Sequence, residues 1–377
     1  MGGSLSSDRN SGSIIIQLDK PKYAAGDQVN GWIHLSLLQA FPCNALYLVI
    51  SGKEKVRFVT TRQEKDPKTE TFKKIVDVHK DSNEFFEHTF PLYSQFGPYF
   101  PPGQYSFPFS FKLSDGLPGS FCHEYTSEGE RCFAKTVYKL KAGLKDPYSN
   151  RAVFQEIRFI VDQRWEFSNG PQQREECKKL TGYCYAELGS FKLSCRYDRD
   201  KFIVGENAVM HIEVDNSECK SDVKLIQCSL KQFLRVKTSD GRNSDFKTTR
   251  ITSAILPGLA KGQKRTGMDA MMVTLPIKTQ SELEATSNGN LVENRFMLVI
   301  EASMEAALCC DSSPSTELEI KIFNRQYAQS VAPPQFPNWS PQVMSPYVCT
   351  MTPQTRMTQE FKNQIYVNKN IQYPHLN

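Results

Sequence analysis

The chain has 377 residues, and its 46 Lys and Arg against 41 Asp and Glu leave a formal net charge of +5, too small and diffuse to indicate nucleic-acid binding. Its 39% apolar and 11% aromatic residues exclude wholesale disorder and suit two domains of about 150 residues each. The longest apolar runs are strand-sized, well short of the roughly 20 residues of a membrane span, and the polar first residues carry no secretory signal.

Short strands are expected along most of the chain, because apolar and polar residues alternate with period two over many short runs. A charged stretch between Arg62 and Thr71 offers no apolar side chain to bury, so we expect an exposed hairpin tip there. Strands are expected over residues 14–18, 29–37, 45–50, 56–61, 72–79, 84–90, 137–144, 154–161, 223–236, 248–255, 268–275, 295–302 and 317–323.

One strand is unusually aromatic. Tyr105, Phe107, Phe109 and Phe111 alternate with other residues, which predicts a heavily aromatic buried face. Pro108 lies on the opposite face and has no amide hydrogen for a strand ladder. Proline in a strand is confined to edges and bulges, so this strand is expected at an edge or a bulge of its sheet.

One segment occurs twice in the sequence, the two copies lying 179 residues apart. Residues 19–29 read DKPKYAAGDQV, and residues 198–208 read DRDKFIVGENA in the same register. Gly26 and Gly205 hold equivalent positions, where glycine supplies a turn dihedral that costs an L-residue energy, and an alternating strand follows each. Two such copies imply two similar all-β domains in tandem.

The composition divides the chain into five parts. Residues 1–12 form a Gly/Ser-rich flexible leader, residues 13–165 the first domain, residues 166–180 a polar hinge and residues 181–325 the second domain. Residues 326–377 are rich in proline and glutamine and poor in charge, which predicts a disordered tail that is dispensable for folding. Within that tail, a second interpretation makes 361–367 a short strand that docks on the first domain.

These segments resemble the arrestin fold family. The string G-x-Y-x-F-P-F-x-F from Gly103 to Phe111, followed by L-P-G-S-F around Pro118, is similar to the family's amino-terminal domain. Residues 193–205, with the strand that begins at Val223, are similar to its carboxy-terminal domain. The resemblance covers about residues 13–325 and is closest to the arrestin-domain-containing (α-arrestin) branch. It implies two tandem immunoglobulin-like β-sandwich domains.

The resemblance also implies an adaptor in the cytoplasm, in peripheral contact with the plasma membrane or endosomes. Such an adaptor binds cytoplasmic tails or loops of membrane proteins and links them to endocytic or endosomal trafficking, through a ubiquitin ligase or a clathrin adaptor. The ligase-recruiting string P-P-x-Y has its nearest match at 333–336, where Phe336 replaces the tyrosine. A stable coat subunit of the retromer type is the alternative, and an enzyme on an arrestin-like scaffold is a more distant one.

Catalysis is not expected. The six histidines are scattered, and the sequence contains no HExxH, no GxSxG and no metal-spaced Cys/His set, so we predict no catalytic residue, no metal and no cofactor. Eleven cysteines without a CxxC pair favour a reduced intracellular setting over a disulfide scaffold.

Three short motifs concern membranes and trafficking. Gly2 fits the myristoylation pattern M-G-x-x-x-S, which predicts acylation there; the alternative is an unmodified, flexible Gly/Ser segment. Cys309 and Cys310 would suit palmitoylation or a membrane loop, or else are two thiols packed at a strand end. Because one acyl chain binds membranes only marginally, a second contact is expected. Tyr373 and Leu376 form a Tyr-x-x-Leu sorting string, of a length that arises easily by chance.

Basic residues recur on adjacent expected strands. A surface made of them would favour acidic or phosphorylated peptides, and a solvated face without a ligand is the alternative. The residues concerned are Lys53, Lys55, Arg57, Lys73 and Lys74.

Overall fold

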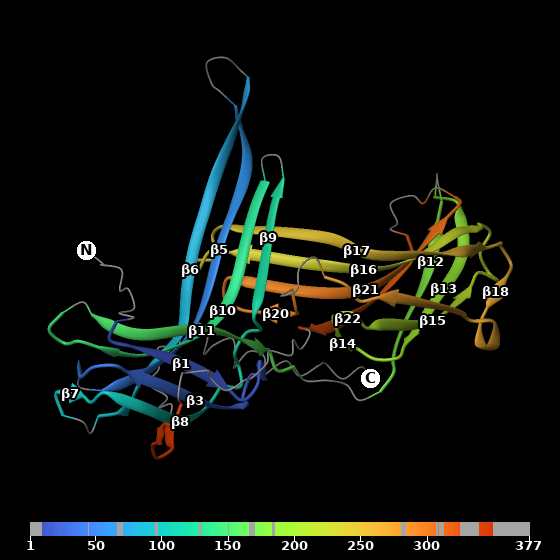
Figure 1. Cartoon of the computed structure of the whole chain (residues 1–377). Helices are drawn as coiled ribbons and strands as arrows, with labels where there is room; N and C mark the ends of the chain where they lie inside the picture. The colour runs from blue at the N-terminus through green and yellow to red at the C-terminus, as the bar shows by residue number, and fades with distance from the viewer. Residues whose placement is uncertain are drawn as a thin grey trace, which may run out of the picture.

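The structure is a computed structural model that describes most of the two expected domains and part of the tail. The structure contains a 3-10 turn over Gly267–Asp269, and among the described residues no helix is long and apolar enough to cross a membrane. Two β-sandwiches lie side by side, and one long hairpin projects from the first (Figure 1). The described residues are 10–43, 45–65, 71–94, 97–127, 130–149, 151–165, 170–182, 185–279, 284–306, 308, 313–324 and 339–349.

The first domain packs a five-stranded sheet on a six-stranded sheet. The five-stranded sheet has the order β1 (Gly12–Leu18), β3 (Gln28–Leu37), β8 (Gly103–Lys112), with β23 (Gln342–Val343) and β24 (Tyr347–Cys349) both on β8. The six-stranded sheet has the order β2 (Lys22–Ala24), β11 (Ala152–Asp162), β10 (Glu130–Lys145), β5 (Leu46–Lys65), β6 (Phe72–Tyr93), with β9 (Phe121–Ser127) on β10. A small ladder joins β4 (Phe41–Pro42) to β7 (Tyr99–Phe100).

The aromatic strand forms the centre of the first core, as predicted. In β8 the rings of Tyr105, Phe107, Phe109 and Phe111 are at most 5% exposed. The inward residues of β3 face them across the antiparallel pairing. Since each buried aromatic removes a large apolar area from water, this strand contributes strongly to the stability of the domain.

The second domain repeats the arrangement. One sheet has the order β12 (Gln172–Thr181), β13 (Glu187–Tyr197), β15 (Asn207–Asp215), β18 (Lys264–Arg265), with β19 (Met271–Pro276) also on β15. The other has the order β14 (Lys201–Ile203), β22 (Ser315–Phe323), β21 (Val292–Met304), β16 (Val223–Lys237), β17 (Ser244–Leu259), with β20 (Ser287–Asn288) on β21.

The duplicated segment adopts the same structure in both domains, which confirms the tandem repeat. Gly26 and Gly205 have φ of 85° and 99°, a region that favours glycine. The next residues, Asp27 and Glu206, each accept a hydrogen bond from the amide three residues earlier, at 2.8 and 2.7 Å. The short strand before each turn runs parallel to the last long strand of its domain, β2 on β11 and β14 on β22.

The hairpin of β5 and β6 is longer than expected. Each strand is expected as two pieces, but β5 and β6 are single strands of 20 and 22 residues, whose pairing shifts register between Gly52 and Lys53. The gap in the pattern arises because two inward positions of β5 hold Gly52 and Glu54. Gly52 leaves room for the rings of Phe85 and Phe86, which would lie 2.4 and 2.5 Å from a Cβ there.

The expected hinge over 166–180 is mostly strand. Residues 172–181 form β12, which pairs antiparallel with β13, whereas 166–169 lie outside the described residues. The pattern resembled a linker because β12 is an edge strand whose residues are exposed or half-buried, apart from Leu180.

Part of the expected disordered tail is a docked strand. Residues 339–349 lie against the first domain, where β23 and β24 pair in parallel with β8. Cys349 is 3% exposed and belongs to the core of the first domain. Strands of two and three residues leave no periodic pattern, which is why the sequence did not reveal them. The alternative strand over 361–367 lies outside the described residues.

A third apolar cluster joins the two domains. It combines residues of β5, β9 and β10 with residues of β16 and of the segment before and at the start of β21. The cluster consists of Val56, Phe58, Phe121, Cys132, Ala134, Leu234, Val236, Leu291 and Val292.

Candidate functional site

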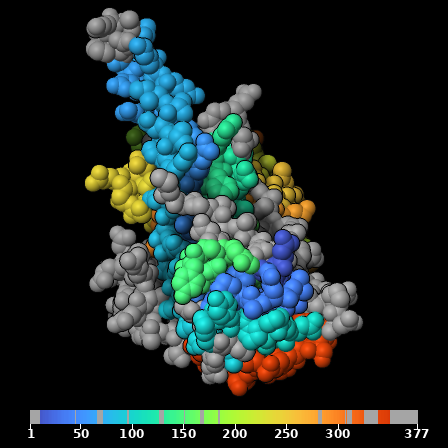
Figure 2. Space-filling model, turned by 60° about the vertical axis from the view of Figure 1, so that its left-hand side comes forward, coloured from blue at the N-terminus to red at the C-terminus, as the bar shows by residue number. Residues whose placement is uncertain are grey.

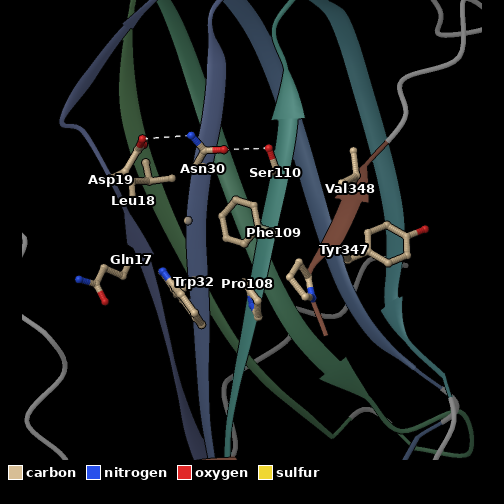
Figure 3. A pocket seen from close by; sticks show the side chains of 12 residues that line it. Gln17, Leu18, Asp19, Asn30, Trp32, Pro108, Phe109, Ser110, Tyr347 and Val348 are labelled. Carbon is tan, nitrogen blue, oxygen red and sulfur yellow. Dashed lines mark hydrogen bonds between the residues drawn. The ribbon is translucent and has the colours of Figure 1, made fainter. Parts of the chain in front are cut away.

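A groove of about 350 Å³ lies between the first-domain sheet and the docked tail. One wall is formed by the end of β1 and the residue after it, and the other by Tyr347 and Val348 of β24 (Figure 3). Trp32 of β3 and Pro108 of β8 lie between these walls. The groove exists only because the tail supplies one of its walls.

The floor of the groove is apolar and partly open. The side chain of Trp32 is 39% exposed, which is a large exposed fraction for so large an apolar ring. Gly31 beside it has no side chain, and the Phe109 ring occupies the space that a Cβ would need, with its Cζ at 2.5 Å. A groove of this kind offers an apolar side chain an apolar contact surface.

The rim of the groove carries a row of hydrogen bonds. Asn30 donates from Nδ2 to Asp19 Oδ2 at 3.3 Å and accepts at Oδ1 from the Ser110 hydroxyl at 2.8 Å (Figure 3). The side chain of Gln28 also contacts the Ser110 hydroxyl. The apolar floor and this exposed polar row together suit an extended peptide, which presents apolar side chains and unpaired backbone groups.

Two prolines, Pro108 of β8 and Pro346 of the tail, explain why the tail docks as two short strands instead of one. β23 pairs with Tyr105 and Ser106, and β24 with the segment from Phe109 to Phe111, so the tail pairing skips Pro108. Proline offers no amide hydrogen to a ladder. Between these pairings the Met344 amide donates to the Ser106 carbonyl at 2.9 Å.

The tail also covers a histidine on the outer face of the sheet. Trp339 packs edge-on against His34, with the ring centroids 5.6 Å apart. His34 Nε2 lies 2.9 Å from Gln17 Oε1, and Nδ1 lies 2.8 Å from the Ser106 hydroxyl. Because Gln17 Oε1 accepts only, Nε2 donates to it and Nδ1 accepts from Ser106, which a neutral ring satisfies. Burial lowers the pKa of His34 and favours this neutral form.

The domain interface buries a carboxyl group. Glu54 of β5 is 0% exposed, and its Oε2 accepts hydrogen bonds from the amides of Asn290 and Leu291 in the second domain at 2.9 and 3.0 Å. Burial raises the pKa of Glu54 to about 7, against the opposing effect of these amides and of Lys237. The contact therefore responds to the pH near neutrality.

Two further polar contacts cross the same interface. His123 of β9 pairs with Glu284 of the second domain, and both are buried. Lys22 Nζ lies 2.7 Å from Asp162 Oδ2 and donates to the Asn324 carbonyl at 2.7 Å. Burial raises the pKa of Asp162, and the nearby Lys22 opposes that effect. Because a buried charge without a partner is costly, these pairs favour one relative position of the domains.

The expected basic surface is only partly assembled. The β5–β6 register places Lys74 opposite Gln63, on the face that carries Lys55 and Arg57. Lys73 pairs with Glu64 and lies on the other face. Lys53 lies at the base of the hairpin, 3.9 Å from Glu84. Lys55, Arg57 and Lys74 thus share one face, from which Lys73 is excluded.

The lipidation and sorting motifs lie outside the described residues. These are Gly2, Cys309, Cys310, Tyr373 and Leu376, and each stays a prediction. Among the residues that the structure does describe, no group of three or more His, Cys, Asp or Glu is placed to hold a metal ion.

Sequence reasoning missed the groove and the buried glutamate. Trp32 could have been noticed in the sequence. It alternates with the buried residues of β3 and stands between Asn30 and His34, so its apolar ring must lie on the outer face of the sheet. Glu54 carried no such signal, since it lies in the charged string Lys53-Glu54-Lys55.

Comparisons with known proteins agree with this architecture. Residues 14–168 match the arrestin (or S-antigen) N-terminal domain, and residues 188–327 match the arrestin (or S-antigen) C-terminal domain. The chain is also similar to the Arrestin domain-containing protein A of Dictyostelium discoideum, with 24% identity over 339 residues. That alignment covers 86% of this chain and 53% of the relative, so the chain spans about half the length of the curated relative that it matches.

Proposed function

Because the chain belongs to the arrestin family, we propose that this arrestin-like adaptor binds extended cytoplasmic segments of membrane proteins and links them to endocytic or endosomal trafficking. It does so in the cytoplasm, at the surface of the plasma membrane or of endosomes. The binding site is the β8 edge of the first domain, where the bound segment takes the place of the tail and forms the same wall of the groove.

The docked tail is the observation that supports this site. Residues 342–349 add an extended strand to β8 through backbone pairing, and they direct Cys349 into the core and Tyr347 against it. Proteins commonly recognise extended peptides by adding them to a sheet edge, where backbone bonds supply affinity and alternate side chains supply specificity. A membrane-protein segment would take the same place once the tail leaves.

The docked tail predicts which segments bind. A segment that replaces β24 would place an aromatic residue at the position of Tyr347 and a small apolar residue at that of Cys349, two positions on. The small residue follows from the tight packing of the core around Cys349, which is 3% exposed. Such a binder would be transient, whereas the coat-subunit alternative requires a stable stoichiometric complex.

A peptide competition tests the proposal. The chain truncated after residue 338 should bind a labelled peptide of residues 339–349, and the full chain should bind it much more weakly because its own tail occupies the edge. Trp32→Ala in the truncated chain should weaken binding, whereas Tyr148→Ala serves as the control, since Tyr148 is 87% exposed on a loop. A scrambled peptide should not bind.

Cellular partners are then tested with the same variants. Proximity labelling with the truncated chain in its native cell should enrich membrane proteins and trafficking components over the full chain, and Trp32→Ala should reverse the gain. An unchanged set of labelled proteins would refute the β8 edge as the cargo site. A single partner that co-purifies in fixed ratio with the full chain would favour the coat subunit instead.

A further inference from the structure

The outer half of the β5–β6 hairpin stands alone. The pairing of β10 with β5 ends at Cys132 opposite Phe58, and among the described residues no strand other than β6 pairs with β5 beyond that point. Residues 59–65 and 72–78 therefore form a two-stranded ribbon, and Figure 2 shows it standing clear of the rest of the molecule. Seven residues at about 3.3 Å each give the ribbon a reach of roughly 23 Å. A lone two-stranded ribbon is marginal in water, so a partner surface would stabilise it.

The two faces of the hairpin differ in charge. One face, called here the basic-apolar face, carries five cations and no acidic residue among its described positions. The opposite face is mixed, with Arg62 paired to Asp77 at 3.2 Å and with Glu64 next to Lys73 across the strands. The basic-apolar face consists of Lys55, Arg57, Val59, Thr61, Gln63 and Lys65 of β5, and Phe72, Lys74, Val76, Val78 and Lys80 of β6.

Apolar side chains lie exposed among these cations. Phe72 is 67% exposed, Val76 52% and Val78 51%. Val76 and Val78 are consecutive on this face, and Val59 pairs with Val78 across the strands. Single exposed apolar residues are common on proteins, but a contiguous set on a projecting ribbon indicates a surface that is covered in use.

The orientation of the basic-apolar face agrees with an external partner. Val56 and Phe58 lie on the opposite face of β5 and pack into the cluster that joins the two domains. The basic-apolar face therefore points away from the second domain, and nothing in the described part of the chain covers Phe72, Val76 or Val78 beyond half.

We propose that the basic-apolar face of the hairpin rests on a lipid bilayer rich in anionic headgroups. Lysine and arginine reach headgroup phosphates while their aliphatic stems lie along apolar surface, and the exposed valines and phenylalanine enter the interfacial layer. A phosphorylated peptide would need cations converging on one point, whereas these cations spread along both strands from Lys55 to Lys74. A planar anionic surface fits this distribution of charge. The inference goes beyond cargo binding, which uses the β8 edge.

Vesicle sedimentation with the full, unacylated chain tests the proposal. The chain should pellet with vesicles of phosphatidylcholine mixed with phosphatidylserine, not with phosphatidylcholine alone, and added salt should weaken the binding. Lys74→Gln with Lys80→Gln should lower the partition coefficient about 25-fold, because each cation near an anionic surface contributes about fivefold. Val76→Ser with Val78→Ser should weaken binding at unchanged charge. All four positions are exposed, so the thermal midpoint should stay the same.

The matched control removes the same charge from the other face. Arg62→Gln with Lys73→Gln changes the net charge equally and should leave the partition within about twofold of the unmodified chain if the basic-apolar face is in contact. Equal losses in both double variants would show a response to net charge alone and would refute the proposal. So would binding of a phosphorylated peptide that depends on Lys74 and Lys80 while vesicles are not bound. Neither result bears on the β8 edge, whose competition assay contains no lipid.

Discussion

Glu54 should make the stability of the two-domain structure depend on pH near neutrality. The perturbation is Glu54→Gln, which keeps an oxygen for the amides of Asn290 and Leu291 and removes the titration. Burial raises the pKa of this carboxyl from 4.5 to about 7. Folded chain therefore binds the proton more tightly than unfolded chain, so the stabilising contribution is complete below about pH 4.5 and is lost as the pH rises through about 7.

The size of the effect follows from that shift. One pKa unit corresponds to about 1.4 kcal/mol, and integration between about pH 5.5 and about pH 8 gives a loss of roughly 2 kcal/mol in the free energy of unfolding. Glu54→Gln should lack this part of the loss. Glu64→Gln, at an exposed position of the same strand, should retain it.

Urea unfolding at both pH values measures the difference. The other titrating groups, such as Asp162 and His34, contribute equally to all three chains and cancel in the comparison. The reasoning would be refuted if the unmodified chain and Glu54→Gln lost the same free energy of unfolding between the two pH values. That result would mean that Glu54 is not buried against the second domain in solution.

Three further predictions concern the tail, the repeated turns and the interface. Deleting residues 339–377 should lower the thermal midpoint by roughly 5–10 °C, because the lost apolar contacts amount to about 2–3 kcal/mol, and calorimetry showing no shift would contradict docking. Gly26→Ala and Gly205→Ala should each lower the free energy of unfolding by about 1–2 kcal/mol, measured with denaturant, since both glycines have positive φ. An unchanged free energy of unfolding in either variant would contradict the structural equivalence of the two turns. His123→Ala or Glu284→Ala should each cost about 3 kcal/mol, and the double variant less than the sum. Additive losses of stability in this double-mutant cycle would mean that the side chains of His123 and Glu284 do not interact.

Much of the fold followed from local patterns. Alternation identified β3 and β8, and the aromatic residues of β8 are buried as predicted, because a side chain's face in a strand depends only on its position in the alternation. The repeated glycine turns required no long-range information either, since a positive φ is a property of one residue. The all-β class and the tandem sandwiches were therefore readable from the sequence.

The features that shape the candidate site were not local. The boundary of the second domain was misplaced, because the charged edge strand β12 has the composition of a linker. The tail strands are too short to show a period, and they dock because β8 offers an unpaired edge on either side of Pro108. The lysines of the hairpin were expected as one surface; alternation along β6 already separates Lys73 from Lys74, and the β5–β6 register adds which of them faces the same way as Lys55 and Arg57.

What the sequence determined by itself was the position of the long alternating strands and the face that each of their side chains takes. What only the tertiary structure decided was which faces are covered and by what. Glu54 meets the amide of Asn290, 236 positions further along the chain, and no pattern around either residue encodes that meeting. Burial raises a pKa, and a free edge accepts a strand, only after distant segments have packed together, so the groove and the interface arise from packing and not from local sequence.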